Sequence, residues 1–333
     1  MDQLLDRFRR EERIDCVLEQ APGALVAGEL AYSTALSYST YLERYIRPRW
    51  GKTRIENVRP MAIQEWLNNL DRAPKTKGHI RSLLYRIFSK AELWELTGTP
   101  NPVRLVEIRG VSKRLRRKPV LTVRQVHAIV SQLPVPYCHM VRVAQATGLR
   151  ASEVLGLQWR DVQWKRRTLS VTRAVVHGRT KNLKTECSAD DLPLDRRLLR
   201  LLRAWKKKCP ASTAGWIFPS PVDPHRGKPF HASPIQQDYF RSAGKKIGID
   251  RLGWAHFRHS FRAWLDAVGT PLGAQKSLMR HTNISTTMNV YGAALMKSKR
   301  AAQARVATMM WGGKGMQGLL RRHLAGGRTD GLK

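Results

Sequence analysis

The sequence predicts a mainly α (α+β) protein with two helical domains, the second of which carries a small antiparallel β-sheet. Apolar residues recur at helical spacing in both halves, one short segment of the second half is alternating and β-branched, and a run of cations separates the halves. The 333 residues suffice for about two domains, and 42% hydrophobic residues with ten Trp can form a core in each.

Cations dominate the composition. The chain has 60 Lys and Arg against 25 Asp and Glu, a formal net charge of +35, and such an excess favours nucleic acid or an acidic membrane surface as partner. No apolar run approaches the roughly 18 residues of a membrane span, and the N-terminus has no apolar stretch of signal-peptide type. The four Cys lie far apart without a CxxC pair, which argues against a disulfide framework or structural zinc. We expect a cytoplasmic, nucleoid-associated protein that binds nucleic acid and no membrane.

The first thirty residues differ from the rest in charge. They hold seven acids and four arginines, a local charge of −3, so the remaining chain carries +38. We expect residues 1–30 to form an acidic lead-in that is mobile or loosely docked, outside the surface that binds nucleic acid. An ordinary solvated helix is the alternative.

Residues 31–109 are predicted to form a helical domain. Tyr41, Leu42, Tyr45 and Ile46 give one apolar face, and Pro60 suits the first turn of a second helix. The third helix has the clearest pattern, with apolar residues at i, i+3, i+4, i+7, i+8 and i+11: Ile80, Leu83, Leu84, Ile87, Phe88 and Ala91. Basic residues flank this stripe, and phosphate contacts are expected at three of them: Lys75, Lys77 and Arg81. A merely solvated face is the alternative.

A basic linker is predicted at residues 110–119. Five cations occupy six positions before Pro119, namely Lys113, Arg114, Arg116, Arg117 and Lys118. Such a run repels itself and stays extended, so it can follow a DNA backbone.

The second domain is predicted over residues 120–310. Thr122 and Gln125 have the spacing of a capping box at the start of a helix, and a second helix runs to about Ala146. Residues 167–177 are expected to form a strand that is separated by a polar turn, 179–191, from a partner at 192–194. Further helices are expected near 195–208, 233–246, 257–268, 272–280 and 284–296. A basic, Gly-rich tail occupies residues 311–333.

Four segments of this domain place a cation or a nucleophile in a defined local setting. They are TGLRASE at 147–153, LKTECS at 183–188, GWAHFRH at 253–259 and MRHTNISTTMNVYG at 279–292. Arg150 should lie at a helix N-terminus, where backbone N–H groups and a guanidinium can bind one anion. His256 and His259 share a helix face, but a metal site would need a third ligand, and none is evident. Taken alone, residues such as Arg150, Lys184 and Tyr291 are more often ordinary surface or packing residues.

Together and in this order, these segments resemble the tyrosine recombinase (phage integrase) family, of the mobile-element integrase type. Residues 31–105 are similar to the core DNA-binding domain of that family, and residues 120–297 to its catalytic domain. Only an acidic segment of 30 residues precedes the first of these, so we expect the arm-binding domain that often lies there to be absent or truncated.

The resemblance implies a role for each motif residue. Arg150 and Arg258 match the two catalytic arginines, and Lys184 matches the hairpin lysine, with Lys181 as the fallback. His281 matches the second catalytic histidine, and Tyr291 the nucleophile.

The chain departs from the family pattern at two positions. Ala255 occupies the place of the first histidine, three residues before Arg258, and His256 stands one residue later. One residue is about 100° of helix rotation, so either His256 substitutes after a local adjustment or this proton-transfer step is impaired. Arg280 stands where Gly is common, and an extra cation there is compatible with a phosphate site.

The resemblance further implies a site-specific recombinase that acts through a 3′-phosphotyrosyl intermediate without metal, ATP or another cofactor. The implied partners are double-stranded DNA at attachment or recombination sites, a homotetramer on synapsed DNA, and a DNA-bending or directionality factor. The alternatives are a catalytically impaired DNA-binding member of the family and a basic packaging protein whose motif match is coincidental.

Overall fold

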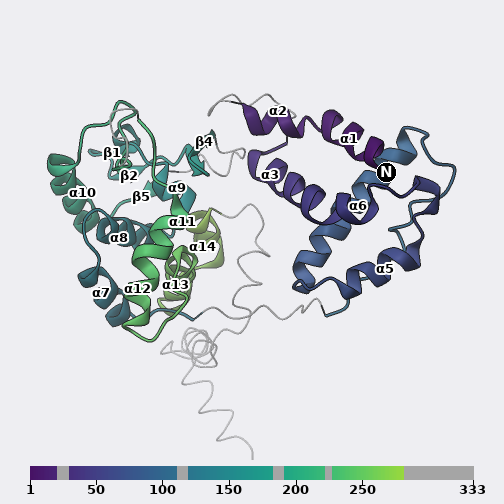
Figure 1. Cartoon of the computed structure of the whole chain (residues 1–333). Coiled ribbons are helices and arrows are strands. Elements are labelled where there is room, and N and C mark those ends of the chain that lie inside the picture. The colour runs from purple at the N-terminus through teal and green to yellow at the C-terminus, as the bar shows by residue number, and fades with distance from the viewer. Residues whose placement is uncertain (21–29, 111–118, 183–190, 222–226, 281–333) are drawn as a thin grey trace, which may run out of the picture. The chain divides into compact units, whose positions relative to one another are not determined.

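The computed structural model describes residues 1–20, 30–110, 119–182, 191–221 and 227–280 (Figure 1). The chain divides into two compact units. The first comprises Met1–Arg116, Arg173–Asn182 and Lys228–Ala232, and the second comprises Arg117–Thr172, Leu183–Gly227 and Ser233–Lys333. The short segment Arg173–Asn182, which the sequence assigns to the second domain, therefore groups by its contacts with the first unit.

The first unit is helical apart from one hairpin. Its helical elements are α1 (Asp2–Glu11), α2 (Ile14–Glu19), α3 (Tyr32–Tyr41), η1 (Leu42–Ile46), α4 (Arg47–Trp50), η2 (Ile55–Asn57), α5 (Pro60–Asn69) and α6 (Pro74–Leu93). Pro60 and Pro74 occupy the first positions of α5 and α6, where a missing N–H costs nothing.

Helix α6 supplies the centre of the core in this unit. All six residues of the predicted stripe, from Ile80 to Ala91, are buried, so the helical periodicity is confirmed. Leu42 and Ile46 of the first predicted helix and Ile63 and Leu67 of α5 are also fully buried in the same cluster. Burial of these apolar side chains holds the helices together.

The first twenty residues differ from the expected loosely docked lead-in. They form helices α1 and α2, which bury Leu5, Phe8 and Ile14 completely in the same core as α6. Glu12 also pairs with Arg86 of α6 at 2.8 Å. A few apolar residues on one face anchor this segment, and the count of acidic residues gave no sign of them.

The second unit contains the remaining helices. They are α7 (Val123–Gln132), α8 (Tyr137–Thr147), α9 (Ala151–Leu155), η3 (Trp159–Asp161), α10 (Arg196–Lys208), α11 (Ala232–Pro234), η5 (Ile235–Phe240), α12 (Arg241–Lys245), α13 (Trp254–Ala267) and α14 (Leu272–Met279). Helix α8 packs against α7, α10 and α13, and it buries most of its side chains.

The start of α7 forms the predicted capping box and is attached to α13. The Thr122 hydroxyl accepts a hydrogen bond from the Gln125 N–H at 3.2 Å, and the Gln125 amide oxygen accepts from the Thr122 N–H at 2.9 Å. The Leu121 N–H donates to the Ser260 hydroxyl at 2.8 Å, and the Trp264 indole donates to the Leu121 carbonyl at 3.1 Å. These bonds fix the position of α13, which carries Arg258.

The strands form two small antiparallel sheets instead of one. Strands β1 (Val162–Gln163), β2 (Thr168–Leu169) and β5 (Leu192–Pro193) pair in the order β1-β2-β5. The pairing of β2 with β5 confirms one part of the predicted pairing of 167–177 with 192–194. Strands β3 (Arg173–Val176) and β4 (Arg179–Asn182) form a separate hairpin.

Residues 179–182, predicted to begin a polar turn, are therefore strand β4. The chain reverses between β3 and β4 through His177 and Gly178, which both have positive φ, 51° and 73°. Two such residues make the tight turn that suits a right-handed strand twist. Polar side chains on β4 hid this pairing from the sequence pattern.

In the part of the chain that the structure describes, no helix combines the length and the apolar character needed to cross a membrane.

Candidate active site

Two helix termini meet at the segment TGLRASE. Helix α8 ends at Gly148, whose φ of +67° lies in the left-handed region that glycine adopts without strain. Two residues later, Arg150 is the N-cap of α9, as the sequence predicts. The turn therefore places the Gly148 carbonyl and the Arg150 guanidinium two residues apart in one loop.

Arg258 joins this loop to the end of α14. Its Nη1 donates a hydrogen bond to the Gly148 carbonyl at 2.6 Å, and its Nη2 donates to the carbonyl of Met279, the last residue of α14. Carbonyl groups at helix C-termini have no partner within their own helix. Arg258 supplies that partner for α8 and α14.

Glu153 holds the side chain of Arg150, which with Arg258 and Arg280 forms an arginine cluster. The Arg150 Nη1 donates to Glu153 Oε1 at 2.8 Å, and the Arg150 backbone N–H donates to Oε2 at 2.9 Å. The Glu153 side chain is 3% exposed, whereas the Arg150 side chain is 46% exposed. Arg150 thus has a buried anchor and a guanidinium accessible from solvent.

Arg280 adds a third guanidinium to the cluster. It is buried, its Nη2 donates to the Val171 carbonyl at 3.0 Å, and its Nη1 lies 4.0 Å from Glu153 Oε2. Its backbone is left-handed, with φ 52° and ψ 50°. The sequence indicates only an extra cation at this position, and the structure adds that Arg280 contacts the carboxylate that holds Arg150.

The three arginines crowd one another electrostatically. Burial, chiefly, together with the positive charges of Arg150 and Arg280 lowers the pKa of Arg258 to about 9, while Glu153 acts in the opposite direction. Arg258 stays protonated at pH 7. Three guanidiniums and one carboxylate give a formal charge of +2, which an anion bound in the cluster would offset.

His256 caps the start of α13. Its Nδ1 accepts a hydrogen bond from the Gly253 N–H, the N-cap of α13, at 3.1 Å, and the residue is buried. Two residues along a helix correspond to about 200° of rotation, so His256 and Arg258 point to different sides of α13. Whether His256 also takes the place of the histidine missing at Ala255 stays a prediction.

Several predicted site residues lie outside the described residues. They are Lys184, His281 and Tyr291 of the predicted catalytic set and Lys113, Arg114, Arg116, Arg117 and Lys118 of the predicted linker. The fallback Lys181 lies on β4, paired with Ala174 of β3.

The predicted DNA-binding cations of α6 have different surroundings. Lys75 is exposed in the first turn. Lys77 donates to the Asn68 carbonyl at 2.8 Å, and Arg81 donates to the carbonyls of Val103 and Val106. Arg81 therefore also connects α6 to the segment that follows it.

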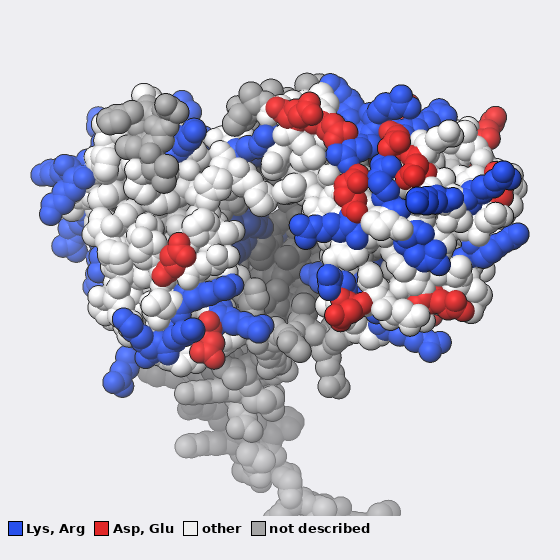
Figure 2. Space-filling model, viewed as in Figure 1, with Lys and Arg blue, Asp and Glu red and all other residues white. Residues whose placement is uncertain are grey.

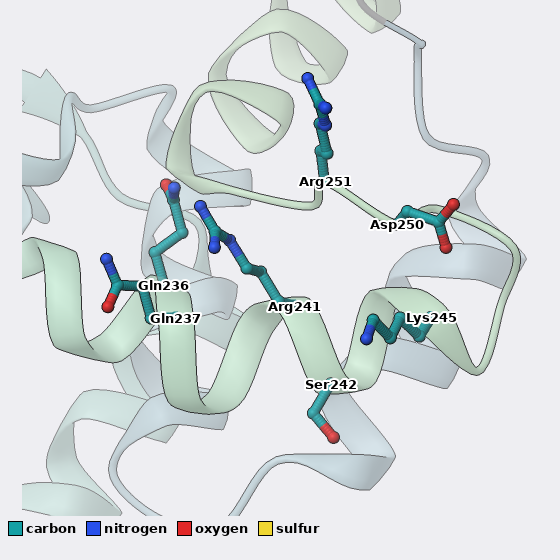
Figure 3. Close-up of a pocket in the computed structure, with 7 residues that line it drawn as sticks. All are labelled: Gln236, Gln237, Arg241, Ser242, Lys245, Asp250 and Arg251. Atoms are coloured by element: carbon teal, nitrogen blue, oxygen red, sulfur yellow. The ribbon is translucent and has the colours of Figure 1, made fainter.

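The second unit has a polar hollow that no sequence motif indicated (Figure 3). It has a volume of about 800 Å³ and is lined by Gln236, Gln237, Arg241, Ser242, Lys245, Asp250 and Arg251. Its three cations exceed its one carboxylate by two charges. Gln237, Arg241 and Lys245 follow at i, i+4 and i+8, a spacing that could have revealed this face.

The hollow is connected to the helix that carries Arg258. The Gln236 amide oxygen accepts a hydrogen bond from the Trp254 N–H at 3.3 Å, at the start of α13.

Acidic side chains are sparse on the visible face of the second unit and more frequent on that of the first (Figure 2). In the described residues, no group of three or more His, Cys, Asp or Glu is arranged to hold a metal ion.

Comparison with known proteins gives consistent matches. A sequence model of the phage integrase family matches residues 118–298. The chain is 26% identical over 185 residues to a XerC-like tyrosine recombinase of Caldanaerobacter subterraneus, covering 48% of this chain and 46% of that protein. It is 24% identical over 274 residues to the tyrosine recombinase XerD of Halalkalibacterium halodurans, covering 78% of this chain and 86% of that protein.

Solved structures share the fold. The Tn1549 transposon integrase, in complex with transposon right end DNA, has a TM-score of 0.72 at 21% identity, covering 92% of this chain and 98% of that chain. A lambda integrase dimer bound to a COC′ core site has a TM-score of 0.63 at 18% identity, covering 88% and 96%.

Gly148→Ala tests how tightly the loop of this cluster is built. A Cβ at Gly148 would overlap the ring of Phe261, whereas a Cβ at Gly248, whose φ is also positive, would meet open space. We expect Gly148→Ala to lower the free energy of unfolding by about 3 kcal/mol and Gly248→Ala by about 1 kcal/mol, measured by urea denaturation. Equal losses would show that the Gly148 turn has room for a side chain.

Proposed function

The chain belongs to the phage integrase family, as a tyrosine-type site-specific recombinase, and we propose that it cleaves and rejoins DNA strands through a covalent 3′-phosphotyrosyl intermediate. The observation that carries this proposal is the arginine cluster at the ends of α8 and α14. Arg150 and Arg258 bring two guanidiniums to one place, and the segment that holds His281 and Tyr291 begins directly after Arg280.

The arginines are suited to hold a scissile phosphate. A guanidinium stays charged at neutral pH and can donate two parallel hydrogen bonds to the oxygens of one phosphate. Phosphoryl transfer develops charge on the non-bridging oxygens, and prearranged donors stabilise that charge without reorganising. In the proposed reaction Arg150 and Arg258 do this, and no metal ion is used.

The proposed chemistry balances without ATP. Tyr291 gives its phenolic proton to a histidine and its oxygen bonds to phosphorus. The bond from phosphorus to the 5′ oxygen breaks, and Lys184 gives a proton to that oxygen. His281 hydrogen bonds to a non-bridging oxygen. The 5′-hydroxyl of a partner strand then attacks the phosphotyrosyl bond and releases Tyr291, so the phosphodiester is restored in the exchanged strand.

The proposed partner is double-stranded DNA at recombination or attachment sites. The Tn1549 transposon integrase and the lambda integrase of similar fold are both seen bound to DNA. Strand exchange between two duplexes needs four cleavages, so we propose a homotetramer on synapsed DNA. An additional DNA-bending or directionality factor is part of the same proposal.

A second candidate function is DNA binding with impaired cleavage. Ala255 provides no proton-transfer group, and the neighbouring His256 is engaged in capping α13. On this alternative the cluster would hold the phosphate, and proton transfer at Tyr291 would be slow.

The hollow of Figure 3 is proposed as a further contact with the DNA backbone. Arg241, Lys245 and Arg251 are exposed there, and Gln236 attaches this surface to α13. Phosphates bound at the hollow would lie near the start of α13, the helix that carries Arg258. Such contacts position the duplex but do not read its sequence.

The Tyr291→Phe variant tests the proposed intermediate. The wild-type chain, incubated with a nicked suicide duplex that carries its recombination site, should form a covalent protein–DNA adduct visible by denaturing electrophoresis. Phe lacks the attacking oxygen, so Tyr291→Phe should form none while it binds the duplex with unchanged affinity. Tight, salt-sensitive binding without any wild-type adduct would support the impaired alternative. An adduct that persists in Tyr291→Phe would exclude Tyr291 as the nucleophile.

Two substitutions of His256 separate capping from proton transfer. Gln accepts a hydrogen bond at the third helical position as His256 does, whereas Ala cannot. We expect His256→Gln to keep the wild-type adduct rate and His256→Ala to lose about 1 kcal/mol of unfolding free energy. A large drop in the adduct rate of His256→Gln at unchanged stability would instead assign proton transfer to His256.

The double variant Arg241→Gln/Lys245→Gln tests the hollow. Each lost phosphate contact removes about 0.9 from the slope of log affinity against log salt, so the slope should become shallower by about 2. The control Arg200→Gln/Lys207→Gln removes the same charge from exposed positions of α10. Affinities measured by fluorescence anisotropy over a salt series check this. Equal effects of both pairs would mean that the hollow has no special part in binding.

A further inference from the structure

We propose that Arg280 is a positioning residue of the cleavage site, which shares Glu153 with Arg150 and thereby raises the net positive charge offered to the reacting phosphate. This inference rests on the proposed function. It concerns a residue that is not one of the two arginines assigned to the phosphate.

The backbone at Arg280 indicates that its side chain is required there. The residue ends α14 in the left-handed region, with φ 52° and ψ 50°. Glycine adopts this conformation without strain, whereas a residue with a Cβ does not. A strained arginine persists only where its side-chain contacts offset the cost.

Those contacts lie inside the cluster. The Arg280 side chain is 2% exposed, and its Nη2 donates to the carbonyl of Val171, which is itself buried. Its Nη1 lies 4.0 Å from Glu153 Oε2, the oxygen that also accepts the Arg150 N–H. Arg280 therefore supports the carboxylate that orients Arg150.

The charge balance shows what Arg280 adds. With Arg280, three guanidiniums face one carboxylate, and the formal charge is +2. Without it, Glu153 would neutralise Arg150, and the charge would fall to +1. Among the described residues, Glu153 is the acidic group that raises the pKa of Arg258, while Arg150 and Arg280 lower it.

This charge matches the reaction better than it matches the bound substrate. A phosphodiester carries one negative charge, and the attacking phenolate brings a second into the five-coordinate transition state. An additional fixed cation therefore stabilises the transition state more than the ground state. Arg280 should act chiefly on the rate of cleavage and only weakly on DNA affinity.

Three variants of the full chain test the proposal. Arg280→Gly removes the charge and suits the left-handed backbone, and Arg280→Lys keeps the charge. Arg262→Gln is the control, because Arg262 is also a buried arginine paired with a carboxylate, Asp266, but lies within α13. Thermal unfolding of each variant shows whether it is folded.

Single-turnover cleavage of the nicked suicide duplex is the first readout. We expect Arg280→Gly to slow adduct formation about thirtyfold and to change DNA affinity less than about threefold, because the lost charge acts on the transition state. Arg280→Lys should restore most of the rate. Arg262→Gln should keep the wild-type rate.

Inorganic phosphate at pH 8, where the dianion dominates, gives a second readout that needs no cleavage. The phosphate concentration that half-saturates thermal stabilisation should rise about tenfold in Arg280→Gly and stay unchanged in Arg262→Gln. A wild type that forms no adduct would refute the proposed function, and this titration would then decide on Arg280 alone. A folded Arg280→Gly with wild-type phosphate affinity, or a rate loss that Arg262→Gln shares, would overturn the proposal.

Discussion

The hydrogen bonds from Arg258 to the carbonyls of Gly148 and Met279 are the contacts on which the rest of the site depends. A buried guanidinium needs acceptors, and the C-termini of α8 and α14 each have carbonyls without an intrahelical partner. The left-handed residues Gly148 and Arg280 stop these helices at that point. The residue types at these two turns and the position of Arg258 therefore depend on each other.

The same arrangement brings three guanidiniums together where burial limits their contact with water. Arg150, Arg258 and Arg280 surround Glu153, and burial with mutual repulsion lowers the pKa of Arg258. The repulsion among the arginines destabilises the fold. The hydrogen bonds between α13 and the start of α7 and the apolar packing of α8 offset this destabilisation. An anionic ligand relieves the repulsion, so affinity for phosphate is built into the unliganded site. In the proposed function, the large net charge of the chain attracts DNA in general, and this small cluster holds one phosphate.

Local sequence spacing made part of this structure predictable. The stripe of α6, the capping box at Thr122 and Gln125, and Arg150 at a helix N-terminus depend on local spacing, and each is confirmed. What could not be predicted depends on tertiary contacts. The pairing of β4 with β3 is formed by polar residues, and the role of Arg280 requires knowing that Val171 and Glu153 lie beside it. The hydrogen bond from the Gly253 N–H to His256 likewise depends on the local geometry at the start of α13, and the sequence motif gave no sign of it.

The most direct test of the central claim is a crystal structure of the chain grown with tungstate, located by the anomalous signal of tungsten. Tungstate is a dianion that resembles phosphate in shape and scatters strongly. We expect one strong tungsten peak within hydrogen-bond distance of the Arg150 and Arg258 guanidiniums. The Arg258→Gln substitution should abolish this peak. Tungstate bound only elsewhere, with the arginine cluster empty at saturating concentration, would contradict it.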